Sequence, residues 1–448
     1  MHPSKNMGIL PIKSKIAYAV SDLGITLPLS AISFFLLYYY TDMLKMAPYL
    51  VGMAMTIAKA WDAVSDPLMG QISDATRSRW GRRRPYILFA AVPYALFFIM
   101  LWTPAASNTE MQNFIYLLAV FILFFTASTV IAIPYNALLP ELTLDHHDRT
   151  RLAGYRQPFS IIGWIAGSAA MLPLVNALSG GQRGFFFTSI IFGCIACIVF
   201  TITFFGIKER EEFSNKESLP LIKSFSFTFK NRAFWIFIAV YSLTSLGYTI
   251  LSTVLIYYAK YCLGSADIFP AMMGTVMGCL LLSIPFWVFL SGKIGKKESF
   301  IIGILVLVTA SILLTVYSGG AGASFYAIMV VAGIGTGAYF MFPFAIMPEI
   351  IDLDELETGT RREGTYYGIF FFIFKLSIAL APLIVGVVLN LFGYQPDTAL
   401  SARTLFGIRT LVGIIPLGLF LAGLLCLVAF PINRRANIEI AQKLSHLN

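Results

Sequence analysis

Two carboxylates and a lysine lie together in an apolar segment, KAWDAVSDPLMG (residues 59–70). Asp62 and Asp66 are four residues apart, so on a helix they would share one face, about 6 Å from each other. Two like charges this close raise each other's proton affinity, and a bound proton or small metal ion relieves the repulsion. A hard cation such as Na⁺ prefers oxygen ligands, which two carboxylates and a hydroxyl would supply. The pattern predicts a cation site; the alternative is that Lys59 neutralises one acid in a buried salt bridge.

Three more polar residues lie in apolar segments, where a charged side chain costs roughly 2.5–3.5 kcal/mol. Asp22 and Thr26 are one turn apart and could line a central cavity together; alternatively, Asp22 lies near the interface and extends to water. Lys375, in FFIFKLSIAL (371–380), would face a polar cavity or an acidic partner, unless it too extends to the interface. We predict that all three contact a substrate.

The segment TVIAIPYNALLPELT (129–143) offers neutral polar ligands. Pro134 and Pro140 would interrupt a helix and free backbone carbonyls, as occurs beside transporter cavities. Thr129 and Asn136 could then supply neutral ligands, with capping of the backbone as the alternative role.

The histidines form no catalytic pattern. His146 and His147 lie in a polar stretch, His2 and His446 lie in the tails, and none has the spacing of a zinc site or a Ser-His-Asp arrangement. SGKIGKK (291–297) lacks the spacing of a phosphate-binding loop. The sequence therefore predicts neither an enzyme nor a bound cofactor.

Composition predicts that lipid-embedded helices position these residues. Of the 448 residues, 58% are hydrophobic and 12% are charged, against about 25% charged in soluble domains. The apolar runs are continuous, unlike the alternating strands of a membrane barrel, and they are long enough to span a bilayer. The predicted spans are 16–41, 48–74, 85–104, 112–139, 157–178, 184–207, 233–262, 266–292, 299–319, 322–350, 365–392 and 407–432.

The order of the spans predicts two halves. We expect an N-terminal six-helix bundle at 1–207, a cytoplasmic central loop at 208–232, and a C-terminal six-helix bundle with a short tail at 233–448. A weak internal repeat supports this, because YYYTDML (38–44) and YYAKYCL (257–263) end corresponding helices. Parallel six-helix repeats build the major facilitator fold, so the predicted fold class is an all-α membrane protein of twelve transmembrane helices.

Charge placement predicts the orientation of the chain. Most of the 32 Lys and Arg residues lie in the N-terminal tail, in alternate loops and in the C-terminal tail. By the positive-inside rule, both termini face the cytoplasm. The net charge of +9 is therefore explained by membrane insertion rather than by nucleic-acid binding.

Five segments distributed from the first span to the eleventh resemble the glycoside–pentoside–hexuronide:cation symporters, which include the melibiose permease and belong to the major facilitator superfamily. They are YYYTD (38–42), WDAVSDPLMG (61–70), RSRWGRRRP (77–85), IPYNALLPELT (133–143) and RREGTYYG (361–368). The resemblance implies cation-coupled import by alternating access. It also implies that Asp62, Asp66 and Thr129 hold the cation, with Na⁺ bound by the two acids if coupling is to sodium, and it matches Lys375 to a family lysine.

The resemblance further implies a cytoplasmic gate. Asp74 with Arg82 and Arg83 resembles the superfamily loop that holds the two halves together in the outward-open state. The charged partners of that gate resemble three residues in the second half, which are Glu349, Asp352 and Arg361.

The substrate positions depart from the melibiose permease. Two aspartates that hold sugar hydroxyls there are Thr26 and Ala132 here, and a tryptophan that stacks on sugar is Asn136. An arginine of the fifth helix is Gln157, with Arg156 beside it. The predicted substrate residues are therefore Asp22, Thr26, Asn136, Arg156, Gln157 and Lys375, and a galactoside is not implied.

These observations predict a secondary transporter of a bacterial-type inner membrane that moves a sugar, glycoside or sugar acid with Na⁺ or H⁺. Its expected partners are the small-molecule substrate, the coupling cation and membrane lipid, and the expected state is a monomer. Two alternatives remain open, which are transport of an amphipathic lipid such as a lysophospholipid and a non-transporting membrane sensor.

Overall fold

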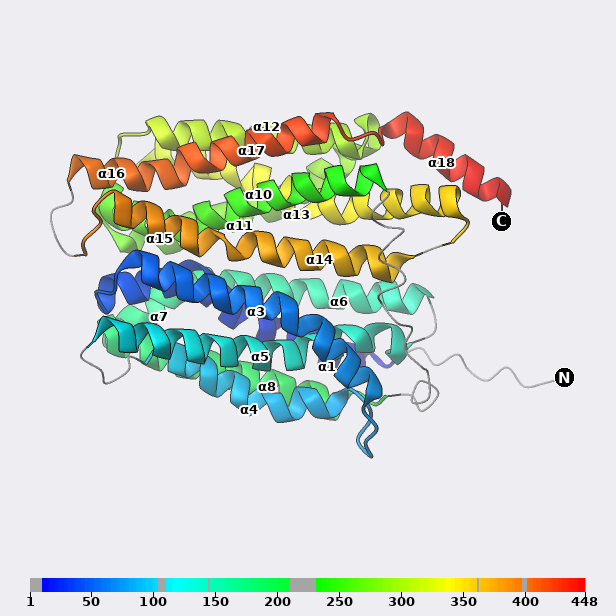
Figure 1. Cartoon of the computed structure of the whole chain (residues 1–448), viewed down its shortest axis with the longest axis horizontal. Helices are drawn as coiled ribbons and strands as arrows, with labels where there is room; N and C mark the ends of the chain where they lie inside the picture. Colours follow the sequence, from blue (N-terminus) through cyan, green and yellow to red (C-terminus); the bar gives the residue numbers. More distant parts are fainter. Residues whose placement is uncertain are drawn as a thin grey trace. The chain divides into compact units, whose positions relative to one another are not determined.

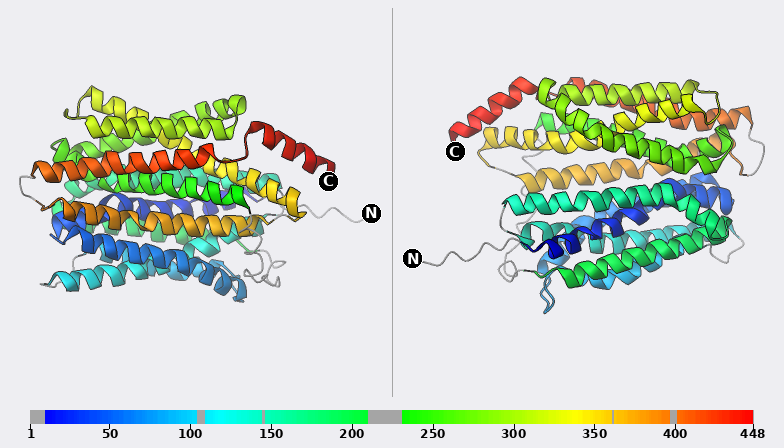
Figure 2. Two further views of the ribbon diagram at one scale, coloured as in Figure 1. Left: turned by 45° about the horizontal axis from the view of Figure 1, so that its top comes forward. Right: turned by 180° about the vertical axis from the view of Figure 1, so that it is seen from behind.

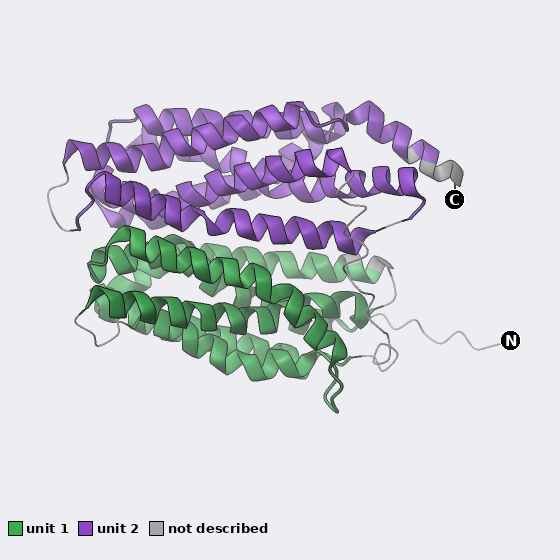
Figure 3. Cartoon of the chain, in the orientation of Figure 1, with its two compact units in different colours: residues 1–219 green, residues 220–448 purple. Residues whose placement is uncertain are grey.

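The computed structural model of this protein describes residues 10–103, 109–143, 146–209, 231–360, 362–396 and 401–447. Regular structure in these ranges is helical throughout (Figure 1). The chain divides into two compact units, residues 1–219 and 220–448 (Figure 3). The predicted separate loop at 208–232 stays a prediction, because residues 210–230 lie outside the described ranges.

The first unit contains eleven helical segments, counted over the described residues. Its first span is broken at Val20, just before Asp22, and its fifth is extended by a short π-helical segment. The segments are α1 (Ile12–Ala19), α2 (Ser21–Ala31), η1 (Ile32–Leu36), η2 (Tyr39–Met43), α3 (Pro48–Ala75), α4 (Arg84–Leu101), α5 (Glu110–Leu142), α6 (His146–Ile165) with η3 (Ala166–Ala170), α7 (Met171–Ala177) and α8 (Gly181–Gly206).

The second unit repeats this plan and adds a C-terminal helix. Its helices run alongside one another over much of their lengths (Figure 2). The segments are α10 (Arg232–Tyr257), η5 (Tyr258–Cys262), η6 (Ala266–Ile268), α11 (Phe269–Ile294), α12 (Lys296–Val316), α13 (Ala323–Thr358), α14 (Glu363–Ala379), α15 (Ala381–Leu391), α16 (Ala402–Arg409), η7 (Thr410–Ile414), α17 (Ile415–Val428) and α18 (Arg434–Leu447).

The described residues contain 11 helices that are long and apolar enough to cross a membrane. The helix missing from that set is α3, which is 28 residues long but carries Lys59, Asp62 and Asp66. Its charges lower its hydropathy, and they are the residues singled out above for chemistry. Together these helices agree with the predicted all-α membrane protein of twelve spans.

Helix packing repeats between the units. In the first unit α3 packs on α5, α4 on α8 and α2 on both α6 and α8. In the second unit α11 packs on α13, α12 on α17 and α10 on both α14 and α17. These are the same pairs when the helices of each unit are counted in order, so the weak repeat in the sequence corresponds to a repeat in packing.

Small residues allow the closest approach between α2 and α6. A Cβ added to Gly163 would lie 2.0 Å from Thr26 Oγ1, and one added to Gly167 would lie 2.5 Å from the carbonyl oxygen of Leu27. Lipid tails are as apolar as leucine, so membrane helices associate through close packing rather than through the hydrophobic effect. Gly163 of α6 and Gly167 of η3 therefore allow α2 to approach closely at these two positions.

Large apolar side chains on the outer faces of the helices agree with a lipid environment. Phe205 and Leu425 are each 72% exposed, and Leu282 is 82% exposed. A water-soluble surface rarely presents such side chains on so many helices, whereas a bilayer favours them.

Several local expectations were wrong. The fifth span does not begin near residue 157, because α6 begins at His146 and places Arg156 inside the helix. Pro134 and Pro140 do not interrupt the fourth span, since α5 continues through both. The predicted short C-terminal tail contains the helix α18 (red in Figure 1). Proline and polar residues are tolerated in these helices because neighbouring helices satisfy the backbone groups they disturb.

Candidate functional site

The predicted cation residues lie together where α3 packs on α5. Thr129 Oγ1 on α5 is 3.0 Å from Asp62 Oδ1 and 3.0 Å from Asp66 Oδ1. Thr129 is only 2% exposed, and both acids are half-buried. A four-residue spacing on α3 therefore places both carboxylates against one hydroxyl of the neighbouring helix.

The chemistry of this donor set fits a small cation. A threonine hydroxyl has one hydrogen and donates to one carboxylate at a time. Since each acid oxygen is 3.0 Å from the same hydroxyl, the two oxygens are at most about 6 Å apart, where two unit charges repel by roughly 3 kcal/mol at an effective dielectric constant of about 20. A proton on one acid, or a cation between the oxygens, would remove this repulsion.

Ser65 belongs to the same group and was missed by the sequence reasoning. Its hydroxyl lies 3.0 Å from Thr129 Oγ1 and donates to the carbonyl oxygen of Asp62 at 3.1 Å. Its position between the two acids was visible in WDAVSDP, but the acids alone were considered. Lys59, one turn before Asp62, interacts electrostatically with that acid, so both the cation site and partial neutralisation by lysine remain compatible with this geometry.

A second polar cluster joins α2, α5 and α6. Arg156 binds Asp22 with two parallel hydrogen bonds, from Nε to Oδ2 at 2.6 Å and from Nη2 to Oδ1 at 2.9 Å. Tyr135 also donates to Asp22 Oδ2, at 2.6 Å. The guanidinium carbon lies 4.6 Å from the ring centre of Tyr135 and 5.7 Å from that of Tyr18. Asp22 is thus a buried carboxylate with three hydrogen bonds from charged or polar donors.

The other predicted substrate residues of the first unit differ in their surroundings. Asn136 is exposed, and its Oδ1 accepts a hydrogen bond of 2.8 Å from Arg156 Nη2. Gln157 is exposed on α6. The hydroxyl of Thr26 is directed to two backbone carbonyls, those of Asp22 at 2.7 Å and Ser160 at 3.1 Å, so it connects α2 to α6.

Lys375 lies in the second unit, half-buried on α14. Its neighbour Phe374 stacks on Tyr241 of α10 with ring centres 5.0 Å apart, and Tyr241 stacks in turn on Tyr339 of α13. The aromatic groups beside Lys375 were not predicted, although FFIFK shows that the lysine follows a run of aromatic residues.

The arginine-rich turn between α3 and α4 forms an ion-pair cluster. Arg83 Nη2 lies 2.8 Å from Asp74 Oδ1 and 3.0 Å from Glu141 Oε1, and Arg82 Nη2 lies 2.6 Å from Glu141 Oε1. The structure therefore brings together Asp74, Arg82 and Arg83 as the sequence suggested, and adds Glu141 from the end of α5. An acid in LPEL, at the same end of its helix as the arginines, was the signal that could have revealed it.

Glu209 fixes the backbone of the same turn. Its carboxylate accepts hydrogen bonds from the backbone N–H groups of Arg82, Arg83 and Arg84 at 2.6, 2.8 and 2.6 Å. These are free donors at the start of α4, where a negative charge also interacts favourably with the helix dipole. The end of the first unit is thereby tied to the turn that follows α3.

The remaining predicted gate residues lie in the second unit. Glu349 of α13 lies 2.8 Å from Lys296 Nζ and accepts a hydrogen bond of 2.6 Å from Asn437 of α18. Asp352 lies one turn further along α13. Arg361 lies outside the described residues.

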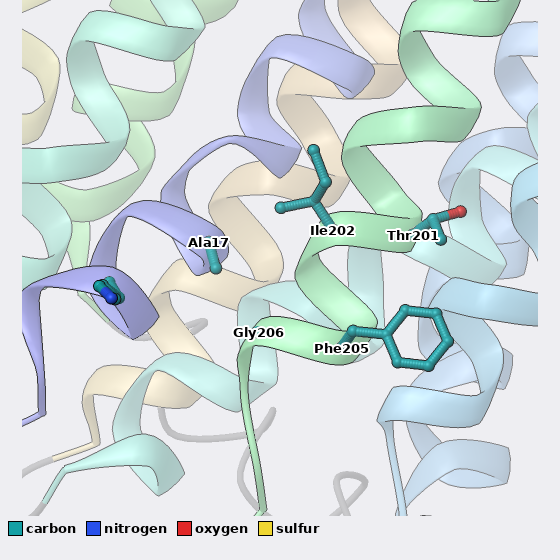
Figure 4. Close-up of a pocket in the computed structure, with 6 residues that line it drawn as sticks. Ala17, Thr201, Ile202, Phe205 and Gly206 are labelled. Atoms are coloured by element: carbon teal, nitrogen blue, oxygen red, sulfur yellow. The ribbon is translucent and has the colours of Figure 1, made fainter.

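A surface pocket lies away from these groups. It is lined by six residues of α1 and α8, which are Lys13, Ala17, Thr201, Ile202, Phe205 and Gly206 (Figure 4). All but Lys13 and Thr201 are apolar, and none is a predicted site residue. Among the described residues, no group of three or more His, Cys, Asp or Glu side chains could hold a metal ion.

Three bacterial relatives match over almost the whole chain. An uncharacterized symporter of Synechocystis sp. is 30% identical, over 97% of this chain and 97% of its own length. A protein of Escherichia coli named as a candidate sulfoquinovose importer is 29% identical over 96% of both chains. The isoprimeverose transporter of Lactiplantibacillus pentosus is 28% identical, over 90% of this chain and 85% of its own length.

One further relative and one solved structure match at lower sequence identity. The sodium-dependent lysophosphatidylcholine symporter 1-A of Danio rerio is 23% identical, over 95% of this chain and 86% of its own length. Among solved structures, a D-xylose–proton symporter superposes with a TM-score of 0.72 at 14% identity, covering 94% of this chain and 97% of its own. This likeness confirms the fold predicted from the sequence.

The family model described as MFS/sugar transport protein matches residues 17–434. That match and the symporters among the relatives confirm the predicted resemblance and the prediction of a transporter rather than an enzyme. The bacterial relatives and the apolar helices identify an integral protein of the inner membrane. The chain therefore belongs to the MFS/sugar transport protein family.

Proposed function

We propose that this protein imports a sugar, a glycoside or a sugar acid together with Na⁺ or H⁺, by alternating access. The observation that carries the proposal is the position of Thr129 Oγ1, 3.0 Å from an oxygen of each of Asp62 and Asp66. Two carboxylates and a neutral hydroxyl form an oxygen-rich site that one small cation would neutralise in part. Symporters among the relatives support a coupling cation.

Coupling in this proposal depends on differential affinity. A cation that bound both conformations equally would shift no equilibrium, however tightly it bound. The site on α3 and α5 would therefore hold the cation more tightly in the conformation that also accepts substrate. By reciprocity, substrate would then raise the affinity for the cation by the same factor.

The cluster of Asp74, Arg82, Arg83 and Glu141 is proposed as the part of a cytoplasmic gate that the first unit contributes. Its support is a set of partly buried ion pairs whose backbone is fixed by Glu209. Glu349, Asp352 and Arg361 would contribute from the second unit. This assignment places both termini in the cytoplasm, as the charge distribution predicts, and it requires only a monomer surrounded by lipid.

Uptake into proteoliposomes tests the proposal. The purified full-length protein is given a panel of sugars, glycosides and sugar acids under a sodium gradient and, separately, under a pH gradient. We expect concentrative uptake under one gradient and its loss in Asp62→Asn and Asp66→Asn. The matched control is Asp267→Asn, the same change at an exposed acid of η6.

Three outcomes contradict parts of the proposal. Full concentrative uptake in both α3 variants would exclude the cation role of these acids. Uptake of lysophosphatidylcholine but of no sugar would favour the second candidate, lipid transport, which the zebrafish relative supports. Binding without transport of any compound would favour a membrane sensor.

A further inference from the structure

The polar cluster around Arg156 presents hydrogen-bond donors rather than acceptors to a ligand. Asp22 is 7% exposed, and its oxygens already accept two bonds from Arg156 and one from Tyr135. A carboxylate so enclosed is poorly placed to hold sugar hydroxyls. Its contacts instead fix the guanidinium in one orientation, because two parallel bonds to the same carboxylate define a plane.

One edge of the Arg156 guanidinium, at the nitrogen Nη1, is available to donate hydrogen bonds to a ligand. Nε and Nη2 are used by Asp22 and Asn136, whereas Nη1 has no hydrogen-bond partner among the described residues. The Arg156 side chain is 19% exposed, compared with 11% for the side chain of Asp22. In this ion pair the Asp22 carboxylate is therefore the more buried group, and part of the Arg156 guanidinium is accessible.

Asn136 extends this donor edge. Its Oδ1 accepts from Arg156 Nη2 at 2.8 Å, so the amide is oriented with Nδ2 and its two hydrogens available. Asn136 is exposed. Gln157 follows Arg156 on α6 and is exposed, and consecutive helix residues do not face each other.

We propose that Arg156 Nη1 and Asn136 Nδ2 bind an oxyanion of the transported substrate, and that Asp22 is a positioning residue that does not contact it. An oxyanion offers only acceptors, which matches a surface of donors, and a hydrogen bond with a charged partner is roughly twice as strong as a neutral one. A neutral sugar would leave its hydroxyl hydrogens without acceptors here. The inference rests on the proposed transport function and specifies its substrate class.

Three kinds of substrate could supply this oxyanion, which are a sugar carboxylate, a sugar sulfonate and a lysophospholipid phosphate. The experiment measures binding of matched pairs to the full-length protein in nanodiscs at fixed Na⁺ and pH. The pairs are methyl glucuronide with methyl glucoside, sulfoquinovose with quinovose, and lysophosphatidate with monoacylglycerol. We expect at least one anionic member to bind about tenfold or more tightly than its neutral partner.

Variants then assign the preference to this edge. Arg156→Lys keeps a charge beside Asp22 but lacks the planar fork, and Asn136→Asp replaces the Nδ2 donors by an oxygen in the same shape. Both should reduce the anionic-to-neutral preference to within about threefold, more through the anionic ligand than through the neutral one. The control, Arg149→Gln, removes an arginine of α6 that bonds the backbone of Pro140 and Thr143, and should leave the preference unchanged.

The positioning role of Asp22 is tested by the anionic-to-neutral binding preference, which a general loss of stability would not change selectively. Asp22→Glu, which keeps the carboxylate, should retain the preference that Asp22→Ala loses, while both remain monodisperse. The inference is overturned if every neutral member binds as well as its anionic partner, or if Arg156→Lys leaves the preference intact. Cation-driven uptake of a neutral sugar would overturn this inference alone, whereas absence of cation-driven uptake for every compound would overturn the proposed function.

Discussion

Thr129 on α5 lies 3.0 Å from Asp66 on α3, in a contact that joins residues 63 positions apart in the chain. The same hydroxyl lies equally near Asp62. One neutral group therefore contacts both acids, and a change at Thr129 affects both of them at once.

Replacing Thr129 by valine should weaken cation coupling without unfolding the protein. Valine has nearly the same shape but lacks the hydroxyl oxygen, and a hydrogen bond to a charged group is worth about 1.5–3 kcal/mol. We expect the cation concentration for half-maximal uptake to rise by about tenfold or more. The control is Thr201→Val, because the hydroxyl of Thr201 bonds to the backbone of its own helix at 2.8 Å. Equal cation dependence in both variants would contradict the role of Thr129.

Gly167→Ala should destabilise the first unit. The added Cβ would lie 2.5 Å from the carbonyl oxygen of Leu27, so α2 and α6 would have to separate. Overpacking of this kind costs about 1–3 kcal/mol, and the melting temperature in detergent should fall. Gly154→Ala, on α6 just before η3, is the control, because its Cβ would meet nothing within 4 Å and alanine favours helix. The prediction fails if the two variants melt alike.

Glu209→Ala should loosen the turn before α4. The change removes the acceptor of three backbone N–H groups, at Arg82, Arg83 and Arg84. Loss of a helix cap costs about 0.5–2 kcal/mol. Hydrogen exchange of these three amides should accelerate in Glu209→Ala. The control is Lys208→Ala, a change at the neighbouring exposed residue, which should leave the exchange rates unchanged. Unaltered exchange in Glu209→Ala would show that other groups fix the turn.

Asp148→Asn should destabilise the protein in a pH-dependent way. Burial alone would raise the pKa of Asp148, but hydrogen bonds from Lys15 and from the backbone of Leu10, with the charges of Lys15 and Arg151, lower this pKa below its ordinary value of 3.8. Because the folded pKa is depressed, the ionised acid stabilises the fold above pH 3.8, and this contribution is lost as the pH falls through the folded pKa.

Melting curves of wild type and Asp148→Asn from pH 7 downward check this expectation. Near neutral pH the variant leaves Lys15 buried beside an uncharged group, which costs about 3–5 kcal/mol for a buried pair. The difference between the two proteins should shrink once the pH falls below 3.8. A difference that stays constant over the whole range would exclude ionisation of Asp148 as the cause.

The fold class was accessible from sequence because hydropathy is a local property. Continuous apolar runs of about 20 residues are required to span a bilayer, and so the helices could be counted without knowing their packing. Ends of helices were harder to predict. The polar start of α6 has low hydropathy yet is helical from His146, and the short C-terminal tail contains the helix α18, which is too polar to be recognised as a membrane span.

Asp62 and Asp66 could be identified from sequence alone, because a spacing of four residues fixes which side chains share a helix face. The partners of these acids could not. Ser65 and Thr129 complete the cluster through a contact between two helices, and Glu141 and Glu209 join the arginine turn in the same way. Such contacts depend on the rotation and depth of each helix, which hydropathy does not specify.

The sequence by itself determined a helical membrane protein, its family resemblance and the acid pair on α3, since each depends on residues close together in the chain. Tertiary structure alone decided that Asp22 binds Arg156, which lies 134 residues away. That pairing turns an acid that sequence reasoning assigned to the substrate into one that orients an arginine. The physical reason is that a buried charge must find a partner, and only helix packing determines which partner is within reach.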